Sequence, residues 1–249
     1  MPFLRNIKLT LSYDGSFFQG WQAQASGRTV QGVLEEALSR ILGGSPKTVA
    51  AGRTDAGVHA LGQVVNVRTD ATIPTEALKR ALNSLLPDDV VIRSAMDASD
   101  DFHARYLAKS KRYVYIIDAS EDPSPFLSRY ALKVDSRLDV PAMQQAALTF
   151  VGEHDFAAFM GAGSPVKSTI RRVSVSELVL KDTRLYYIIE GSGFLRHMVR
   201  NIVGTLLMVG RGSLAPEDIL GIIQGRDRAK AGPTAPPQGL YLAAVNYEE

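Results

Sequence analysis

Hydrophobic and polar positions alternate along residues 6–13, which predicts a half-buried β-strand. Residues 29–42 instead carry apolar side chains at helical spacing, with Thr29 placed to cap the helix and two glycines placed to end it. The same reasoning predicts the remaining elements of the first half: strands at 47–53, 63–69 and 90–96, and a helix from Pro74 that stops before Pro87. The predicted order in this half is β-α-β-β-α-β.

The second half of the chain repeats this order. Its predicted elements are a strand at 110–118, a helix from Pro141 to about 151, a strand pair at 169–181 and 184–194, a helix over 194–210, a short helix after Pro216 and a strand at 239–247. Each half therefore has the element order of a ferredoxin-like unit. We predict an α+β fold in which two ferredoxin-like halves, 1–104 and 105–249, form a long mixed, mainly antiparallel sheet with a central cleft.

Composition narrows the chemistry. The chain has 249 residues, 45% of them hydrophobic, and no cysteine, which excludes disulfides, cysteine-ligated zinc and thiol catalysis. No stretch approaches the roughly 18 consecutive apolar residues of a membrane span, and no signal peptide is evident, so we expect a cytoplasmic protein without a membrane partner. Although the net charge is only +2, basic residues gather at 110–113, 167–172, 196–200 and 225–230. Such patches bind a phosphate backbone or are solvated faces, and the sequence allows both interpretations.

The stretch AAGRTDAGVHA at 50–60 places one carboxylate, Asp55, among glycines and alanines and close to Arg53. Small residues let other atoms approach the backbone closely. From the residues alone, the stretch is either a turn with a structural Arg53–Asp55 ion pair or a loop that presents a functional carboxylate. A carboxylate can attack a sugar carbon. No second ligand lies at helical spacing, so no metal site is predicted.

Six motifs in chain order resemble the TruA family of tRNA pseudouridine synthases: YDGSFFQGWQAQ (13–24), GRTDAGVHA (52–60), FHAR (102–105), KRYVYII (111–117), HMVRNIVG (197–204) and AP-x-x-GLYL (235–242). The resemblance implies an enzyme that isomerises uridine to pseudouridine at positions 38, 39 and 40 of the tRNA anticodon stem-loop. It also implies a homodimer that uses no cofactor and no metal.

By the same resemblance, Asp55 is the catalytic aspartate, Arg200 is the arginine that pairs with it, and Tyr113 is the active-site tyrosine. Tyr115 lies on the same strand face as Tyr113 and is the competing tyrosine. We expect Arg53 to contact the RNA. Candidate phosphate contacts are Lys109, Lys111, Arg112, Arg171 and Arg172.

Two further points stay open in the sequence. The loop that holds Phe17, Trp21 and Gln22 either contacts RNA or packs Trp21 against the first helix. The main alternative function is a non-catalytic RNA-binding protein of two ferredoxin-like units, which leaves GRTDAGVHA without a role. A third is an aspartate-dependent N-glycosidase, which would release the base instead of isomerising it.

Overall fold

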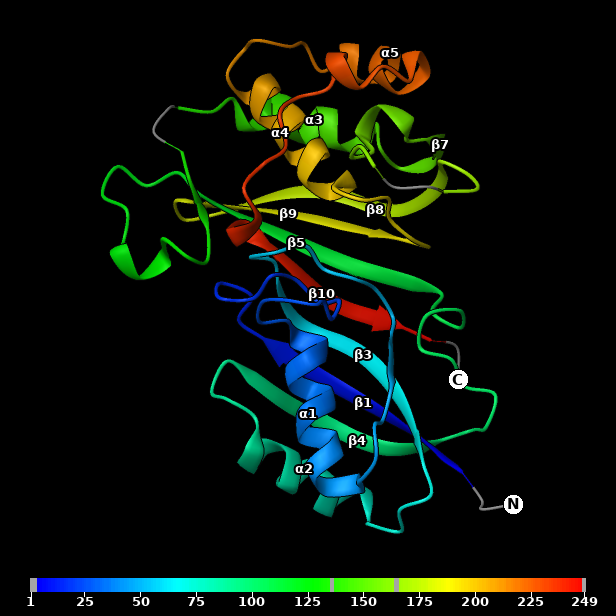
Figure 1. Ribbon diagram of the computed structural model, residues 1–249. Coiled ribbons are helices and arrows are strands. Elements are labelled where there is room, and N and C mark those ends of the chain that lie inside the picture. The colour runs from blue at the N-terminus through cyan, green and yellow to red at the C-terminus, as the bar shows by residue number, and fades with distance from the viewer. Residues whose placement is uncertain (1–3, 135–136, 164–165, 248–249) are drawn as a thin grey trace. The chain divides into compact units, whose positions relative to one another are not determined.

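The computed structural model describes residues 4–134, 137–163 and 166–247, and these form two compact units. The first unit comprises the chain up to residue 109 together with the C-terminal strand from residue 241 on, and the second comprises residues 110–240. The predicted division instead assigned everything after residue 104 to the second half. Figure 1 shows the elements of both units.

The first unit has the predicted element order. Its elements are β1 (Arg5–Tyr13), α1 (Val30–Leu42), β2 (Thr48–Ala50), β3 (His59–Thr69), α2 (Thr75–Leu85) and β4 (Val90–Ala98), joined by β10 (Leu240–Asn246) from the end of the chain. β1 lies between β3 and β4 and is antiparallel to both. The long strand β3 pairs with β10 in parallel at His59 and Ala60, and with β2 in antiparallel fashion farther along, at residues 65–67. The β4-β1-β3-β2 order is the one that a ferredoxin-like unit adopts.

Helices α1 and α2 cover one face of this sheet (Figure 1). Their buried residues follow the helical spacing seen in the sequence, with Leu34 and Leu38 on α1 and Leu78 and Leu82 on α2, all fully buried. Burying a leucine side chain contributes roughly 1.5–3 kcal/mol. The hydrophobic pattern therefore fixes which side of each helix faces the sheet.

The second unit contains the other strands and helices. They are β5 (Ser110–Asp118), β6 (Leu132–Lys133), α3 (Val140–Leu148), β7 (Gly152–Asp155), β8 (Ile170–Lys181), β9 (Arg184–Gly191), α4 (Met198–Gly210) and α5 (Asp218–Gly225), with short 3₁₀ helices at Pro125–Leu127, Ala157–Phe159, Arg228–Lys230 and Pro237–Gly239. The strand order β5-β9-β8-β7 is antiparallel throughout, and β6 pairs with β5 in parallel. Helix α3 packs against β8, where Ser176 donates a hydrogen bond of 2.6 Å to the carbonyl of Ala147.

The α+β class and the mixed, mainly antiparallel pairing are confirmed, and the central cleft stays a prediction. The helix predicted over 194–210 begins only at Met198, because His197 adopts a left-handed conformation with φ 59°. Strands β6 and β7 were not predicted, since one has two residues and the other, GEHD, shows no alternation. Within the described residues, no helix has both the length and the apolar character needed to cross a bilayer.

Helix α4 supports the segment 231–235 through close backbone packing. The N–H of Gly232 donates to Oγ1 of Thr205 at 2.8 Å, and the carbonyl oxygen of Pro233 lies 1.7 Å from where a Cβ on Gly204 would stand. No side chain fits at Gly204 unless the helix and the segment separate. The glycine of the motif at 197–204 is therefore a packing residue.

We predict that Gly204→Ala lowers the free energy of unfolding by at least about 2 kcal/mol, because the new methyl group must displace backbone. Gly221→Ala is the matched control, since Gly221 lies within α5 and has open space where its Cβ would stand. There the substitution should be neutral or stabilise by up to about 1 kcal/mol. Urea unfolding measures both, and equal stabilities for the two variants would contradict the close packing.

Candidate functional site

Asp55 lies in the loop between β2 and β3, where the chain makes a tight turn. The N–H of Val58 donates to the carbonyl of Asp55 at 3.2 Å, and Gly57 takes a left-handed conformation with φ +76°. Asp55 is half-buried, whereas the side chain of Thr54 beside it is buried. The turn thus places one carboxylate between the interior and the solvent.

The segment 14–28 holds this loop by its backbone. The N–H of Trp21 donates to the carbonyl of Thr54 at 3.0 Å, and the N–H of Gly57 donates to the carbonyl of Phe18 at 3.3 Å. A Cβ on Gly20 would stand 2.7 Å from the oxygen of Thr54, so only glycine allows this approach. The motif at 13–24 therefore serves as a scaffold for the loop that carries Asp55.

Polar side chains hold the same loop from the interior. The hydroxyl of Tyr13 lies 2.7 Å from Oγ1 of Thr54, and Nε2 of Gln63 donates to the carbonyl of Gly52 at 2.7 Å. Burial raises the pKa of Tyr13 to about 12, so its hydroxyl stays protonated and can donate. These contacts fix residues on both sides of Arg53. Sequence reasoning missed Tyr13 and Gln63, although Tyr13 opens a matched motif.

The structure decides between the two interpretations of the loop at residues 17–22. Trp21 is 1% exposed, its ring centre lies 6.1 Å from that of Tyr13, and its carbonyl accepts the N–H of Gln31 at the start of α1. Gln22 also hydrogen-bonds Gln31, through their amides at 2.6 Å. Trp21 and Gln22 are therefore packing residues, whereas Phe17 is 64% exposed.

Arg53 and His59, which flank Asp55, have different surroundings. Arg53 is exposed, and among the described residues its guanidinium forms no ion pair with Asp55. His59 is 2% exposed, its Nδ1 lies 3.1 Å from the N–H of Gly15, and its ring stacks on Tyr241 at 4.7 Å. His59 is thus part of the scaffold, while Arg53 faces the solvent.

In the second unit, β5 directs Tyr113 and Tyr115 to the same buried face. The hydroxyl of Tyr115 donates to the carbonyl of Pro236 at 2.7 Å, and burial raises the pKa of Tyr115 although the charge of Arg200 opposes this. Tyr113, two residues earlier in the strand, is 8% exposed, with its ring edge-on to Phe194 at 5.1 Å. Both tyrosines are buried, but only Tyr113 keeps a small exposed fraction, since Tyr115 is 0% exposed.

Arg200 lies in the first turn of α4 and is held by the segment 235–239. Its Nε donates to the carbonyl of Ala235 at 2.7 Å, and its own carbonyl accepts the N–H of Ala235 at 3.1 Å. A Cβ on Gly239 would stand 2.7 Å from the ring of Tyr115. The closing motif therefore packs against both Arg200 and Tyr115.

The predicted phosphate contacts of the second unit divide between two faces of its sheet. Lys111 is opposite Gly191 on β9, and Gly191 is opposite Val173 on β8. Directly opposed residues share a face, and residues two apart on a strand share one as well. Lys111 and Arg171 therefore lie on the face of Tyr113, and their neighbours Arg112 and Arg172 lie on the other.

Internal partners further distinguish these arginines. Arg112 pairs with Glu190 across the strands, with a shortest distance of 2.7 Å. Arg171 donates to the carbonyls of Ser168 and Ile170, and burial lowers its pKa from the ordinary arginine value. A phosphate that binds Arg112 must therefore compete with a carboxylate.

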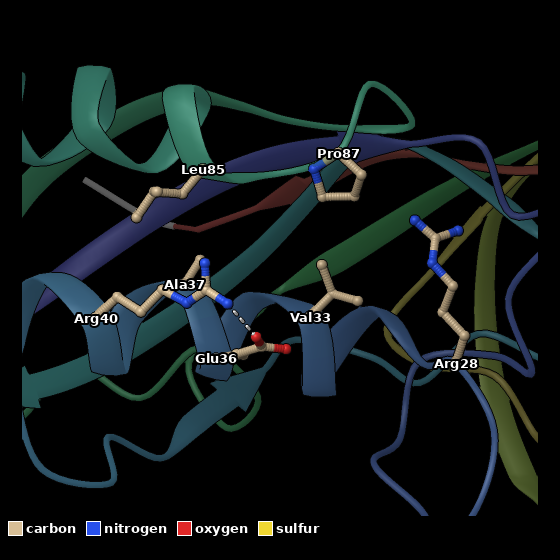
Figure 2. Close-up of a pocket in the computed structure, with 7 residues that line it drawn as sticks. All are labelled: Arg28, Val33, Glu36, Ala37, Arg40, Leu85 and Pro87. Atoms are coloured by element: carbon tan, nitrogen blue, oxygen red, sulfur yellow. Dashed lines mark hydrogen bonds and ion pairs between the residues drawn. The ribbon is translucent and has the colours of Figure 1, made fainter.

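A hollow of about 230 Å³ lies in the first unit, and none of the predicted site residues lines it. Figure 2 shows residues of α1 along one side and Leu85 and Pro87 along the other. Its arginines bind carboxylates, Arg28 to Asp89 at 2.6 Å and Arg40 to Glu36 at 2.7 Å. Within the described residues, no three acidic or histidine side chains gather to hold a metal ion.

Comparison with known proteins gives a family match along most of the chain. The model of a family described as tRNA pseudouridine synthase matches residues 10–107 and 146–248. Proteins named tRNA pseudouridine synthase A from Ruminiclostridium cellulolyticum and Acetivibrio thermocellus are each 46% identical to the chain, covering 98% of it and 100% of their own length.

Solved structures give a weaker likeness. A crystal structure of the archaeal box H/ACA sRNP Nop10–Cbf5 complex matches with a TM-score of 0.34 and 14% identity, covering 81% of this chain and 44% of that one. A Cbf5–Nop10–Gar1 complex matches with a TM-score of 0.36 and 16% identity, covering 81% and 45%. This chain thus spans less than half of each of those chains.

We predict that Tyr13→Phe lowers the free energy of unfolding by about 1 kcal/mol at neutral pH, because a buried hydrogen bond to Thr54 is lost. In the wild type, the folded state keeps a proton that the unfolded state releases above pH 10. The contribution of Tyr13 to the free energy of unfolding is therefore constant below pH 10. It declines by about 1.4 kcal/mol per pH unit as the pH rises toward 12.

Urea unfolding between pH 8 and 12 measures this, and Tyr13→Phe should show a shallower alkaline decline than the wild type. Thr54→Val is the matched control, since it removes the same hydrogen bond but keeps the buried hydroxyl, so the steeper decline remains. Identical slopes for the wild type and Tyr13→Phe would contradict the buried, protonated hydroxyl.

Proposed function

The chain belongs to the tRNA pseudouridine synthase family, and on this premise we propose that it modifies uridines 38, 39 and 40 of the tRNA anticodon stem-loop with Asp55 as the catalytic carboxylate. The observation that carries the proposal is the loop of Asp55. Its backbone is fixed by the segment 14–28 and by buried side chains, while its carboxylate stays half-buried. A fixed carboxylate is what an aligned attack on a bound nucleoside requires.

The reaction itself explains why one carboxylate suffices. The bond from C1′ to N1 of uridine breaks, a bond from C1′ to C5 forms, the proton on C5 is released, and N1 gains a proton. The uracil leaves as a delocalised anion and stays bound, so no water has to be activated as in a glycosidase. Whether the carboxylate attacks C1′, adds to C6 or removes a sugar proton, the step requires ionised Asp55.

We propose that Tyr113 and Arg200 act with Asp55. The ring of Tyr113 is oriented by Phe194, and an aromatic ring so fixed can stack on a base. The guanidinium of Arg200 is oriented by the carbonyl of Ala235, and a guanidinium keeps a neighbouring carboxylate ionised and aligned. Arg53, exposed beside Asp55, would replace or hold a nucleotide extruded from the stem.

The RNA contacts and the assembly follow from the same premise. Lys111 and Arg171 share the face of Tyr113, which favours them as phosphate contacts, while Arg112 and Arg172 would contribute from the other face. Protein contacts with phosphate position an RNA without reading its sequence. We propose in addition that the enzyme works in the cytoplasm as a homodimer. Sedimentation with and without tRNA tests the oligomeric state.

The proposal predicts that Asp55→Asn abolishes the reaction without abolishing binding. With unmodified tRNA that carries tritium at C5 of uridine, the wild type should release tritium, and with unlabelled tRNA it should leave the RNA mass unchanged. Asp55→Asn should lower the single-turnover rate at least about 1000-fold, since it removes the ionised oxygen. The Kd for tRNA should change less than about threefold, because the scaffold contacts remain.

The matched control is Asp70→Asn, which makes the same change at an exposed aspartate of the same unit and should leave the rate unchanged. Carbodiimide mapping of the product should place the new pseudouridines at positions 38–40. Loss of the base from the RNA would indicate an N-glycosidase, and binding without any release would indicate a non-catalytic RNA-binding protein. Release that persists in Asp55→Asn would place the chemistry on another residue.

A further inference from the structure

The motif FHAR lies in the turn that follows β4, where Ala104 is buried, Phe102 and His103 are half-buried and Arg105 is exposed. Ala104 is fully buried in a small core cluster with Ala51 and Val64, and Phe102 packs against the ring of Tyr247 at 5.1 Å. Tyr106, two residues after Ala104, is 75% exposed. The phenylalanine and alanine of the motif thus anchor a turn that presents other side chains to the solvent.

Two buried asparagines fix the backbone of this turn. Nδ2 of Asn6 donates to the carbonyls of Ser99 and Phe102 at 2.9 and 2.8 Å. Oδ1 of Asn66 accepts the N–H of Ala104 at 3.0 Å, and its Nδ2 donates to Oδ1 of Asn6 at 3.0 Å. Because buried polar groups are costly to leave unpaired, this linked pair holds the turn in one conformation.

An aromatic and cationic cluster lies on the outer side of the fixed turn. The ring of His103 stacks on Tyr106 with centres 4.2 Å apart and an angle of 27° between planes. Nδ1 of His103 accepts the N–H groups of Arg105 and Tyr106, each at 3.2 Å, so the imidazole cannot rotate without losing both bonds. The guanidinium carbon of Arg105 lies 5.8 Å from the ring centre of Tyr106. We call these three residues the outer stack.

We propose that the outer stack is a docking site for an unpaired nucleobase of the RNA substrate, outside the base pair that contains the target uridine. The base would stack on Tyr106, and a flanking phosphate would bind Arg105. This inference rests on the proposed function for the identity of the RNA, and on the geometry of the turn for the site.

The chemistry of the cluster favours a base over a protein surface. Unpaired bases in RNA are recognised by stacking on aromatic side chains and guanidinium groups. The outer stack offers an exposed ring that is stacked on a second ring, with the guanidinium carbon of Arg105 over it at 5.8 Å. A turn that is already ordered adds no ordering cost to binding.

The place of the turn in the first unit suits a single bound stem-loop. Ala104 shares its core cluster with Ala51, which lies four residues before Asp55. An extended chain advances at most about 3.6 Å per residue, and the members of the cluster touch directly or through Val64, so the Cα atoms of Tyr106 and Asp55 lie within about 40 Å. An RNA arm that presents a uridine to Asp55 can therefore reach the outer stack with another of its bases.

The test uses anticodon stem-loop RNAs with 2-aminopurine at one unpaired position at a time, so that stacking on protein quenches the fluorescence. We expect quenching by the wild type at one position and its loss in Tyr106→Ala, with Kd increased about 10-fold. Tyr106→Trp should keep the quenching, and Tyr106→Leu should lose it, because leucine keeps apolar area but has no π face. Arg105→Gln should lower the salt dependence of binding by about one phosphate contact.

The matched control is Phe126→Ala, since Phe126 is 85% exposed and lies in a 3₁₀ helix of the other unit. It should leave the quenching and Kd unchanged. Three results would each overturn the inference. They are unchanged RNA binding by Tyr106→Ala, an equal loss of quenching and affinity in Phe126→Ala, and a change in the oligomeric state of Tyr106→Ala. Tritium release separates a failure of the proposed function from a failure of this inference. A wild type that releases no tritium can still quench the 2-aminopurine fluorescence, and a Tyr106→Ala variant that releases tritium can still lack the quenching.

Discussion

The backbone hydrogen bond from Trp21 to Thr54, made at the close approach of Gly20, is the interaction on which the proposed active site depends. The same segment also supplies the carbonyls of Gly20 and Trp21 to the first N–H groups of α1, which otherwise lack partners. One stretch of chain thus starts the helix and fixes the loop of Asp55. Any change that moves this stretch must move the carboxylate as well.

The second unit uses the same principle with other residues. The segment 235–239 exchanges backbone and side-chain hydrogen bonds with Arg200, accepts the hydroxyl of Tyr115, and packs at Gly239 where no Cβ fits. In both units the glycines and buried polar groups of the motifs fix the positions of neighbouring backbone segments. Only a few residues of each motif present a side chain that could act on a substrate. This division separates the proposed site residues, Asp55 and Tyr113, from the scaffold around them.

The sequence predicted the fold well where a periodic pattern decides the structure. The helical stripe of α1 and the alternation of β1 and β5 placed their elements within a residue or two. The start of α4 was wrong because the left-handed conformation of His197 leaves no trace in hydrophobic spacing. The supporting contacts of Tyr13 and Gln63 join residues that are distant in the chain, so no local pattern shows them. The motifs predicted Asp55 as the catalytic residue, but they did not show which neighbouring residues hold its loop.

The most direct test of this account is the single-turnover rate of Gly20→Ala on unmodified tRNA. Gly43→Ala is the control, because Gly43 also has a positive φ but has open space where its Cβ would stand. Both substitutions strain the backbone, and only the first pushes against the loop of Asp55. The account predicts a rate at least about 10-fold lower for Gly20→Ala with tRNA binding retained, and a rate near wild type for Gly43→Ala. Equal rates for the two variants would contradict it.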